Sequence, residues 1–177
     1  MRKVLLLVLL ITLMYGCSGD VDLGNPQFNA SVDIPKGVDT SSVSVLVGNK
    51  MIALSKDAKF SISDSRLLFA TTKDNKILYV GAPGQGDLVK FKLDSRETAL
   101  YFALKEMPGI LTSSNFEVLK NLKDVLYQNF PSIEVLEKAI EKNVARVGYF
   151  EKDSVLTEIH TVSDEIIAAF DLYNYKF

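Results

Sequence analysis

The chain has 177 residues, of which 47% are hydrophobic, and its 20 basic and 22 acidic residues give a net charge of −2. This length suffices for one ordinary domain or two small ones, and the hydrophobic content supports a packed core. Because basic residues are not in excess, the composition argues against nucleic acid as a partner and against electrostatic adhesion to anionic lipid.

The first 17 residues have the pattern of an export signal. Two basic residues, Arg2 and Lys3, precede an apolar run over 4–14, and the small Gly16 stands directly before Cys17. The run is shorter than the roughly 20 residues that a membrane span needs. Cys17 is the single cysteine of the sequence, so it has no partner for an internal disulfide. We expect residues 1–16 to be a signal peptide, cleaved between Gly16 and Cys17; an ordinary secretory signal with an incidental cysteine is the alternative.

Leu13, Gly16 and Cys17 resemble the signal of bacterial lipoproteins. The resemblance implies cleavage before Cys17, lipid attachment to its sulfur and anchoring in the cell envelope, usually by two or three acyl chains. Ser18 follows the cysteine, which favours the outer membrane where the host has one. Residues 17–26 would form the lipidated tether, which reaches no more than about 30 Å. The mature chain keeps 18 basic and 22 acidic residues, a net charge of −4.

Residues 27–94 alternate between apolar and polar with a period of two, which is typical of strands. Seven apolar runs lie in this region: those around 28–34, 43–47, 60–62 and 89–93 alternate, and those around 51–54, 67–70 and 77–80 are short and continuous. We expect an antiparallel β-sandwich of six or seven strands. Turn residues separate the runs at Gly48-Asn49, Lys56-Asp57, Asp64-Ser65 and Asp74-Asn75.

The middle of this region, with Asp57, Phe60 and Ile62, resembles the carboxypeptidase-regulatory or transthyretin-like β-sandwich. Lys59 stands where that group usually has a glycine. The resemblance implies a non-catalytic module of the kind found in secreted and surface proteins. An immunoglobulin-like sandwich is the rival fold, because the same alternation permits it.

Residues 95–177 change to a period of about 3.6, which predicts three or four helices packed on the sandwich as one cooperative unit. Ser95 is expected to cap the first helix, Ser114 and Glu117 to form a capping box, and Ser132 to cap the third helix. A fourth helix is expected within residues 154–172. The predicted buried faces consist of Leu100, Ala103, Leu104 and Met107, then Val118, Leu119, Leu122, Val125 and Leu126, then Ile133, Leu136, Ile140 and Val144, then Val155, Ile159, Val162, Ile166 and Ala169 or Phe170. Overall this is an α+β chain.

Two further patterns lie in the helical half. The group Ser95, Thr98, Ala99 and Leu100 after a sandwich resembles a junction of uncharacterised bacterial surface lipoproteins. The alternating aromatics Tyr173, Tyr175 and Phe177 predict a final strand on the sandwich edge, although such an end also resembles the assembly signal of outer-membrane barrels.

Few residues of this sequence favour catalysis. His160 is the one histidine, and we expect it to lie on the surface or at a helix end. One histidine and one acylated cysteine cannot supply the usual zinc ligands, and no calcium-loop motif is present, so we expect neither metal nor cofactor. The glycine-rich stretch with Gly81, Gly84, Gln85 and Gly86 is the best candidate for a binding loop, because loops on rigid sheets carry recognition.

We therefore expect a non-catalytic envelope lipoprotein, attached to the membrane through Cys17, that binds a protein or glycan partner. Two alternatives stay open. A carboxylate-based hydrolase or accessory subunit would need two acids in one pocket, 5–10 Å apart as in glycosidases (about 5–9.5 Å). A lipid-binding envelope chaperone would need a large apolar cavity between sheet and helices.

Overall fold

The structure, a computed structural model, describes residues 28–62, 67–84, 91–107, 109–112, 116–146 and 148–174. Within these residues the strands are β1 (Phe28–Val32), β2 (Val43–Val47), β3 (Lys50–Ala53), β4 (Lys59–Ile62), β5 (Leu68–Thr72), β6 (Ile77–Gly81) and β7 (Phe91–Leu93). The α-helices are α2 (Ser95–Lys105), α3 (Phe116–Asn129), α4 (Pro131–Asn143) and α5 (Asp153–Asn174). Short 3-10 turns occur at η1 (Thr40–Ser42), η3 (Ile110–Thr112) and η4 (Tyr149–Glu151). The α+β prediction is confirmed.

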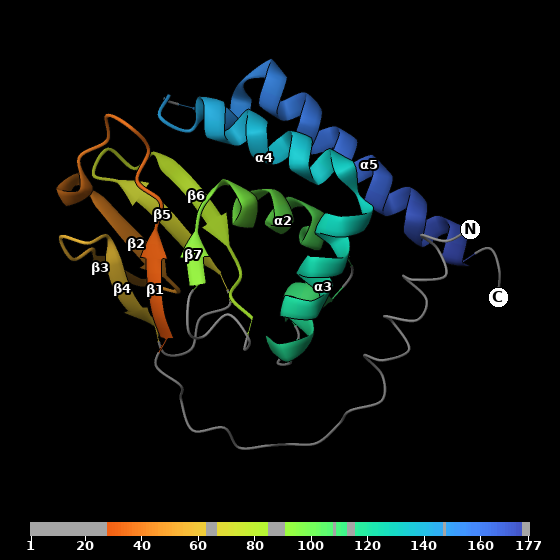
Figure 1. Cartoon of the computed structure of the whole chain (residues 1–177), viewed down its shortest axis with the longest axis horizontal. Coiled ribbons are helices and arrows are strands. Elements are labelled where there is room, and N and C mark those ends of the chain that lie inside the picture. Colours follow the sequence, from red (N-terminus) through yellow and green to blue (C-terminus); the bar gives the residue numbers. More distant parts are fainter. Residues whose placement is uncertain are drawn as a thin grey trace.

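The strands form two sheets, one of three strands in the order β4-β1-β7 and one of four in the order β3-β2-β5-β6. Both lie at one end of the molecule, and the helices gather beside β6 and β7 (Figure 1). The prediction of purely antiparallel strands is wrong for one pair, because β1 and β7 are parallel, with Ala30 opposite Phe91. The strands between them in sequence supply the long connection that a parallel pair needs.

The predicted turns have two different roles. Gly48-Asn49 closes the β2–β3 hairpin between Val47 and Lys50, and Gly48 has a φ of +59°, which glycine adopts readily. Asp74-Asn75 likewise joins the antiparallel pair β5 and β6. Lys56-Asp57 instead carries the chain from β3 in one sheet to β4 in the other, so it does not close a hairpin. Asp64-Ser65 lies outside the described residues.

One continuous apolar core joins the sheets to the helices. Val45 and Leu68 of the four-stranded sheet, Leu93 of the three-stranded sheet, Leu104 of α2 and Leu136 of α4 are all completely buried in it. Because the same core contains residues from both halves of the chain, the helices pack on the sheets as expected.

The central helix is α2, which contacts β6 and β7 as well as α3, α4 and α5. All four residues predicted for its inner face are buried. The predicted cap is wrong by one residue: the side chain of Asp94, not that of Ser95, accepts a hydrogen bond from the backbone N–H of Glu97, at 3.0 Å. Asp94 has the extended backbone that a capping residue needs, whereas Ser95 is already helical and buried.

The three outer helices occur where the period of 3.6 predicts them. Their buried residues include Leu119, Leu122, Leu126, Ile133, Leu136, Ile140, Val144, Val155, Ile159, Val162, Ile166 and Ala169, all as predicted, whereas Val125 is only partly buried. The predicted cap of α4 is wrong: Phe130 holds the capping position without a side-chain bond, Pro131 begins the helix, and Ser132 donates instead to Glu165 at 2.9 Å. Ser114 and the tail beyond residue 174 lie outside the described residues.

The C-terminal segment with the alternating aromatic residues is helical as far as the structure describes it. Tyr173 belongs to α5, which continues to Asn174, so it does not begin a final strand. The helix that the period of 3.6 in residues 155–169 predicts continues through this segment, so the alternation of the aromatics does not decide its structure.

Side chains from the helical half satisfy the open edge of β6. The Thr98 hydroxyl accepts a hydrogen bond from the backbone N–H of Val80 at 3.1 Å and donates to the carbonyl of Asp94 at 2.8 Å. The Tyr149 hydroxyl donates to the Leu78 carbonyl at 2.6 Å, and burial raises the pKa of this phenol. An edge strand presents unpaired backbone groups, so these bonds explain how β6 can be buried at the edge of its sheet.

Replacing Thr98 with valine tests this edge contact. The change keeps the shape of the side chain but leaves the buried N–H of Val80 without its acceptor, so we expect the free energy of unfolding to fall by about 1–3 kcal/mol. Thr98→Ser keeps the hydroxyl and is the matched control. Chemical denaturation measures both, and equal losses for the two variants would contradict the proposed role of the hydroxyl.

Candidate functional site

The structure places only part of the predicted sites. Gly16, Cys17, Gln85 and Gly86 lie outside the described residues. Gly81, at the end of β6, and Gly84 are buried. A Cβ atom at position 81 would lie 2.8 Å from Cδ1 of Leu93, so Gly81 has a packing role that lets β6 approach β7. The glycine-rich binding loop therefore stays a prediction.

Close to Gly81, a buried ion pair joins α2 to α3. The Lys123 ammonium donates to a carboxylate oxygen of Glu97 at 2.7 Å, and the two side chains are only 5% and 14% exposed. The same ammonium lies 5.3 Å from the centre of the Phe91 ring. Each charge has a counter-charge, so the arrangement suits a fixed joint between helices. We did not predict this pair from the sequence, although a lysine among Leu119, Leu122 and Leu126 on a predicted buried face was a signal for it.

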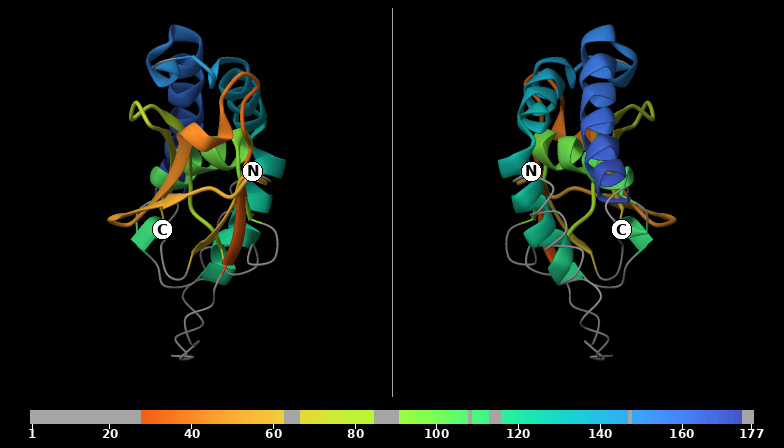
Figure 2. Two further views of the ribbon diagram at one scale, coloured as in Figure 1. Left: turned by 90° about the vertical axis from the view of Figure 1, so that its left-hand side faces the viewer. Right: turned by 90° about the vertical axis from the view of Figure 1, so that its right-hand side faces the viewer.

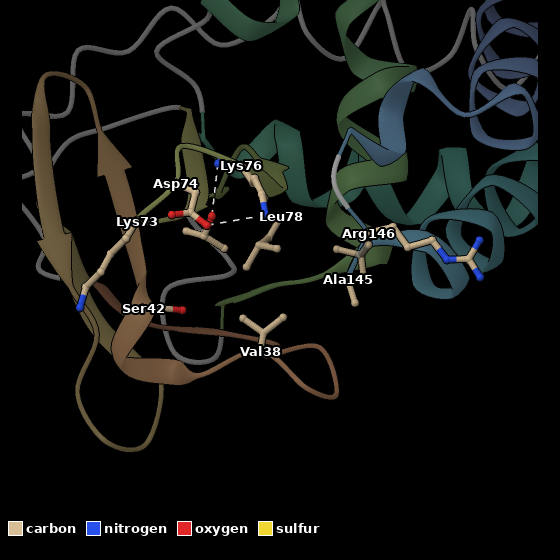
Figure 3. A pocket seen from close by; sticks show the side chains of 10 residues that line it. Val38, Ser42, Lys73, Asp74, Lys76, Leu78, Ala145 and Arg146 are labelled. Carbon is tan, nitrogen blue, oxygen red and sulfur yellow. Dashed lines mark hydrogen bonds and ion pairs between the residues drawn. The ribbon is translucent and has the colours of Figure 1, made fainter.

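A shallow pocket of about 280 Å³ opens between the residues before β2, the β5–β6 turn and the end of α4. It is lined by Val38, Ser42, Thr72, Lys73, Asp74, Lys76, Leu78, Val144, Ala145 and Arg146. Figure 3 shows Val38 and Leu78 in its middle, whereas Lys73 and Arg146 extend their charged ends away from it. Residues far apart in sequence form this pocket, so no local motif could have predicted it.

The chemistry of the pocket is that of an apolar recess with a charged rim. Lys76 pairs with Asp74 at 3.6 Å, and the Asp74 side chain is mostly exposed. A guanidinium nitrogen of Arg146 lies 3.5 Å from the side-chain oxygen of Asn143. The volume is at the lower end of small-molecule sites, about 300–1,000 Å³. The pocket can receive a small apolar group, but its polar side chains do not converge on one point.

Other predicted chemistry is dispersed over the described residues. His160 is exposed on α5, and Asp57 and Asp74 are exposed in turns. No group of three or more histidine, cysteine, aspartate or glutamate residues in the described ranges could hold a metal ion. No helix in the same ranges is long and apolar enough to cross a membrane.

The outer face of the four-stranded sheet carries an unusual set of side chains. Val45 and Ala70 point into the core, so their neighbours Leu46 and Phe69 point to the other side. The register places Met51 beside Leu46, and Leu46 beside Phe69, in one row across three strands. Met51 is 56% exposed, and Leu46 and Phe69 are partly exposed. Ile77 is 41% exposed and pairs with Thr71, two residues after Phe69 on the same strand, beyond a register shift at Ala70. We call Leu46, Met51, Phe69 and Ile77 the apolar sheet face.

The outer face of the three-stranded sheet is a natural comparison. There Ala30, Phe60 and Phe91 point into the core, and the residues on the other side are Ser31, Lys59 and Lys92. This sheet has the polar outer side that is usual when one face of a sheet meets water. The described helices contact the four-stranded sheet chiefly at β6, and in the left view of Figure 2, taken from the side of the strands, the helices lie behind them. Val80, opposite Phe69 on β6, continues the row but is buried. The apolar patch therefore lies on the part of this sheet that the described helices leave open, and exposed apolar patches mark interaction surfaces.

Comparison with known proteins gives no relative from which a function could be transferred. The chain matches no protein-family model, no curated protein and no solved structure. The apolar sheet face and the pocket beside it are therefore the features on which a function can be argued.

Proposed function

We propose that this protein is a bacterial envelope lipoprotein, held to its membrane by lipid on Cys17, that acts as a non-catalytic binding module. The observation that carries the proposal is the leader itself: an apolar run too short to span a bilayer delivers the single cysteine of the chain directly after a small residue. Acylation explains both the position of that thiol and the absence of a second one.

We also propose that the two sheets form a β-sandwich related to the transthyretin-like modules. Seven strands divided between two sheets support this, as does the shared core between Val45 of one sheet and Leu93 of the other. The parallel pair β1–β7 departs from the simplest sandwich pattern. Modules of this kind present surfaces and loops for recognition.

The binding role is supported by the apolar sheet face, where Met51 and Ile77 are exposed beside Leu46 and Phe69. A protein partner fits this flat apolar surface better than a glycan, whose hydroxyl groups need polar contacts. The alternatives need other features. The described pocket contains one carboxylate, the exposed Asp74, where a hydrolase needs two, and its 280 Å³ is small for a lipid carrier.

Labelling with palmitate tests the anchor. Cells that express the full chain should incorporate labelled palmitate into the protein, and Cys17→Ser should lose the label, because serine has no thiol to acylate. A Ser18→Ala variant, changed at the neighbouring position, is the matched control and should label like the wild type. Equal labelling of wild type and Cys17→Ser would contradict acylation at Cys17.

A further inference from the structure

The edge strands of the two sheets differ in whether their backbone groups already have partners. The edge of β6 is bonded by the side chains of Thr98 and Tyr149. At β4, Ser55 takes up both backbone groups of Lys59: its N–H donates to the Lys59 carbonyl at 2.9 Å, and its hydroxyl accepts from the Lys59 N–H at 3.1 Å. The edge of β3 has no such cover within the described residues, where β3 pairs with β2 on one side alone.

The β2–β3 hairpin fixes which backbone groups of β3 are open. Val47 and Lys50 flank a two-residue turn in which Gly48 has a φ of +59°. The strand residues that close such a turn exchange hydrogen bonds, and in an antiparallel ladder bonded pairs alternate with pairs that are not bonded. The next pair, Leu46 with Met51, is therefore one that does not exchange hydrogen bonds.

The other side of β2 gives the same result independently. The backbone N–H of Lys73 donates to the carbonyl of Ser42 at 2.8 Å, so the even-numbered positions along β2 direct their backbone groups toward β5. Met51 and Ala53 lie opposite even-numbered residues of β2. Their N–H and C=O groups consequently point to the open edge, where they bond to nothing in the described part of the chain. Both residues are exposed.

We propose that β3 of one copy pairs antiparallel with β3 of a second copy, around a two-fold axis at Ile52. In this register Met51 of each copy lies opposite Ala53 of the other, so every open N–H and C=O group of these residues finds a partner. The strand lies on the side of the molecule away from the helices, where a second copy can approach it (Figure 1). This inference rests on the proposed binding role and names the partner as another copy of the same chain.

The side chains fit the same register. The small Ala53 would lie beside the large Met51, and Lys50 would lie opposite Leu54, so no lysine opposes a lysine. The residues on the outer side of the four-stranded sheet are uncharged and form two rows, Met51, Leu46, Phe69 and Val80, and Ala53, Ser44, Thr71 and Ile77. Pairing would join these rows across the two copies. A self-complementary contact about a two-fold axis is the commonest symmetry of homodimers.

Disulfide formation by Ile52→Cys tests this pairing in membranes from cells that express the full chain. The two copies of residue 52 would face each other as a pair without hydrogen bonds, with Cα atoms about 4.5 Å apart, which a disulfide can span. A mild oxidant should therefore convert Ile52→Cys to a disulfide-linked dimer. Met51→Cys should give little dimer, because its two copies would lie roughly 8 Å apart, beyond the reach of a disulfide.

Lys59→Cys is the matched control at another edge, because it is exposed on β4, where Ser55 already bonds the backbone. It should not form dimers. Wild type shows any background from Cys17. Whether each variant stays with the membrane reports the anchor, so failure of the anchor is seen separately from failure of the contact.

A proline at position 53 tests the hydrogen bonds themselves. Ala53→Pro, added to Ile52→Cys, removes an N–H that β2 does not use, so the hairpin should form and the thermal unfolding temperature should stay close to that of Ile52→Cys. The disulfide-linked dimer should be lost. Ala53→Ser keeps the N–H and should keep the dimer.

Three results would each overturn the proposal. They are no dimer from Ile52→Cys in membrane-attached protein, as much dimer from Lys59→Cys as from Ile52→Cys, and equal yields from Ala53→Pro and Ala53→Ser. A disulfide from Ile52→Cys to a different protein in place of the dimer would also overturn it, because the occupant of the edge would then be another chain.

Discussion

Replacing Glu97 with leucine is expected to lower the free energy of unfolding by about 3–5 kcal/mol, the usual cost of leaving one partner of a buried ion pair without its counter-charge. The Lys123 ammonium, now 2.7 Å from the Glu97 carboxylate, would remain in a site where its side chain is only 5% exposed. The ammonium would lose its close counter-charge in a site that water reaches little, which weakens the joint between α2 and α3. Chemical denaturation measures the loss.

The double variant Glu97→Leu with Lys123→Met makes the test specific. It removes both charges and keeps apolar volume, and such replacements of buried pairs are often neutral or stabilising. We therefore expect it to recover most of the stability that the single variant loses. Glu134→Gln removes one partner of the exposed pair with Lys138, which has a similar distance of 2.6 Å, and should change stability little. Equal losses of stability in the single and the double variant would contradict the view that the unpaired Lys123 charge causes the loss.

Replacing Leu104 with alanine is expected to lower the free energy of unfolding by about 2–5 kcal/mol, because the side chain is completely buried and its removal leaves a cavity. The helix α2 that carries it contacts β6 and β7 on one side and the outer helices on the other. The loss should therefore weaken both halves of the chain together, as the prediction of one cooperative unit requires.

Hydrogen exchange distinguishes cooperative from separate unfolding. Amide protection should fall in β5 and in α4 by the same free energy in Leu104→Ala, since both belong to one core. Leu156→Ala, on the exposed side of α5, is the control and should leave protection nearly unchanged. A loss of protection in α4 with β5 unaffected would show that sheets and helices unfold as two units.

The sequence predicts the elements of this fold better than it predicts how they meet. The strands and helices could be predicted because their apolar residues repeat with a period of two or 3.6, or form short continuous runs between turn residues, and each of these is a property of one segment alone. The parallel pairing of β1 with β7 depends on which distant segments share a core, and no local pattern contains that information. The capping error at Ser95 is of another kind, since Asp94 and Ser95 are adjacent and both can cap a helix.

The candidate sites likewise divide into features that a local pattern indicates and features that form only when distant segments meet. Arg146, Lys73 and Val38 line one pocket but lie far apart in the chain, so their meeting could not be predicted. The apolar sheet face did leave a signal. Leu46 lies between Val45 and Val47, and Phe69 between Leu68 and Ala70, so each strand is apolar on both sides. Continuous apolar runs of this length are typical of strands with two covered faces.

The most direct test of the account is the mass of the N-terminal peptide of the protein recovered from the membrane fraction of its host. We expect a chain that begins at Cys17 and carries covalently attached acyl groups on that residue. A mature protein recovered from the medium, with a different first residue and an unmodified Cys17 thiol, would contradict it.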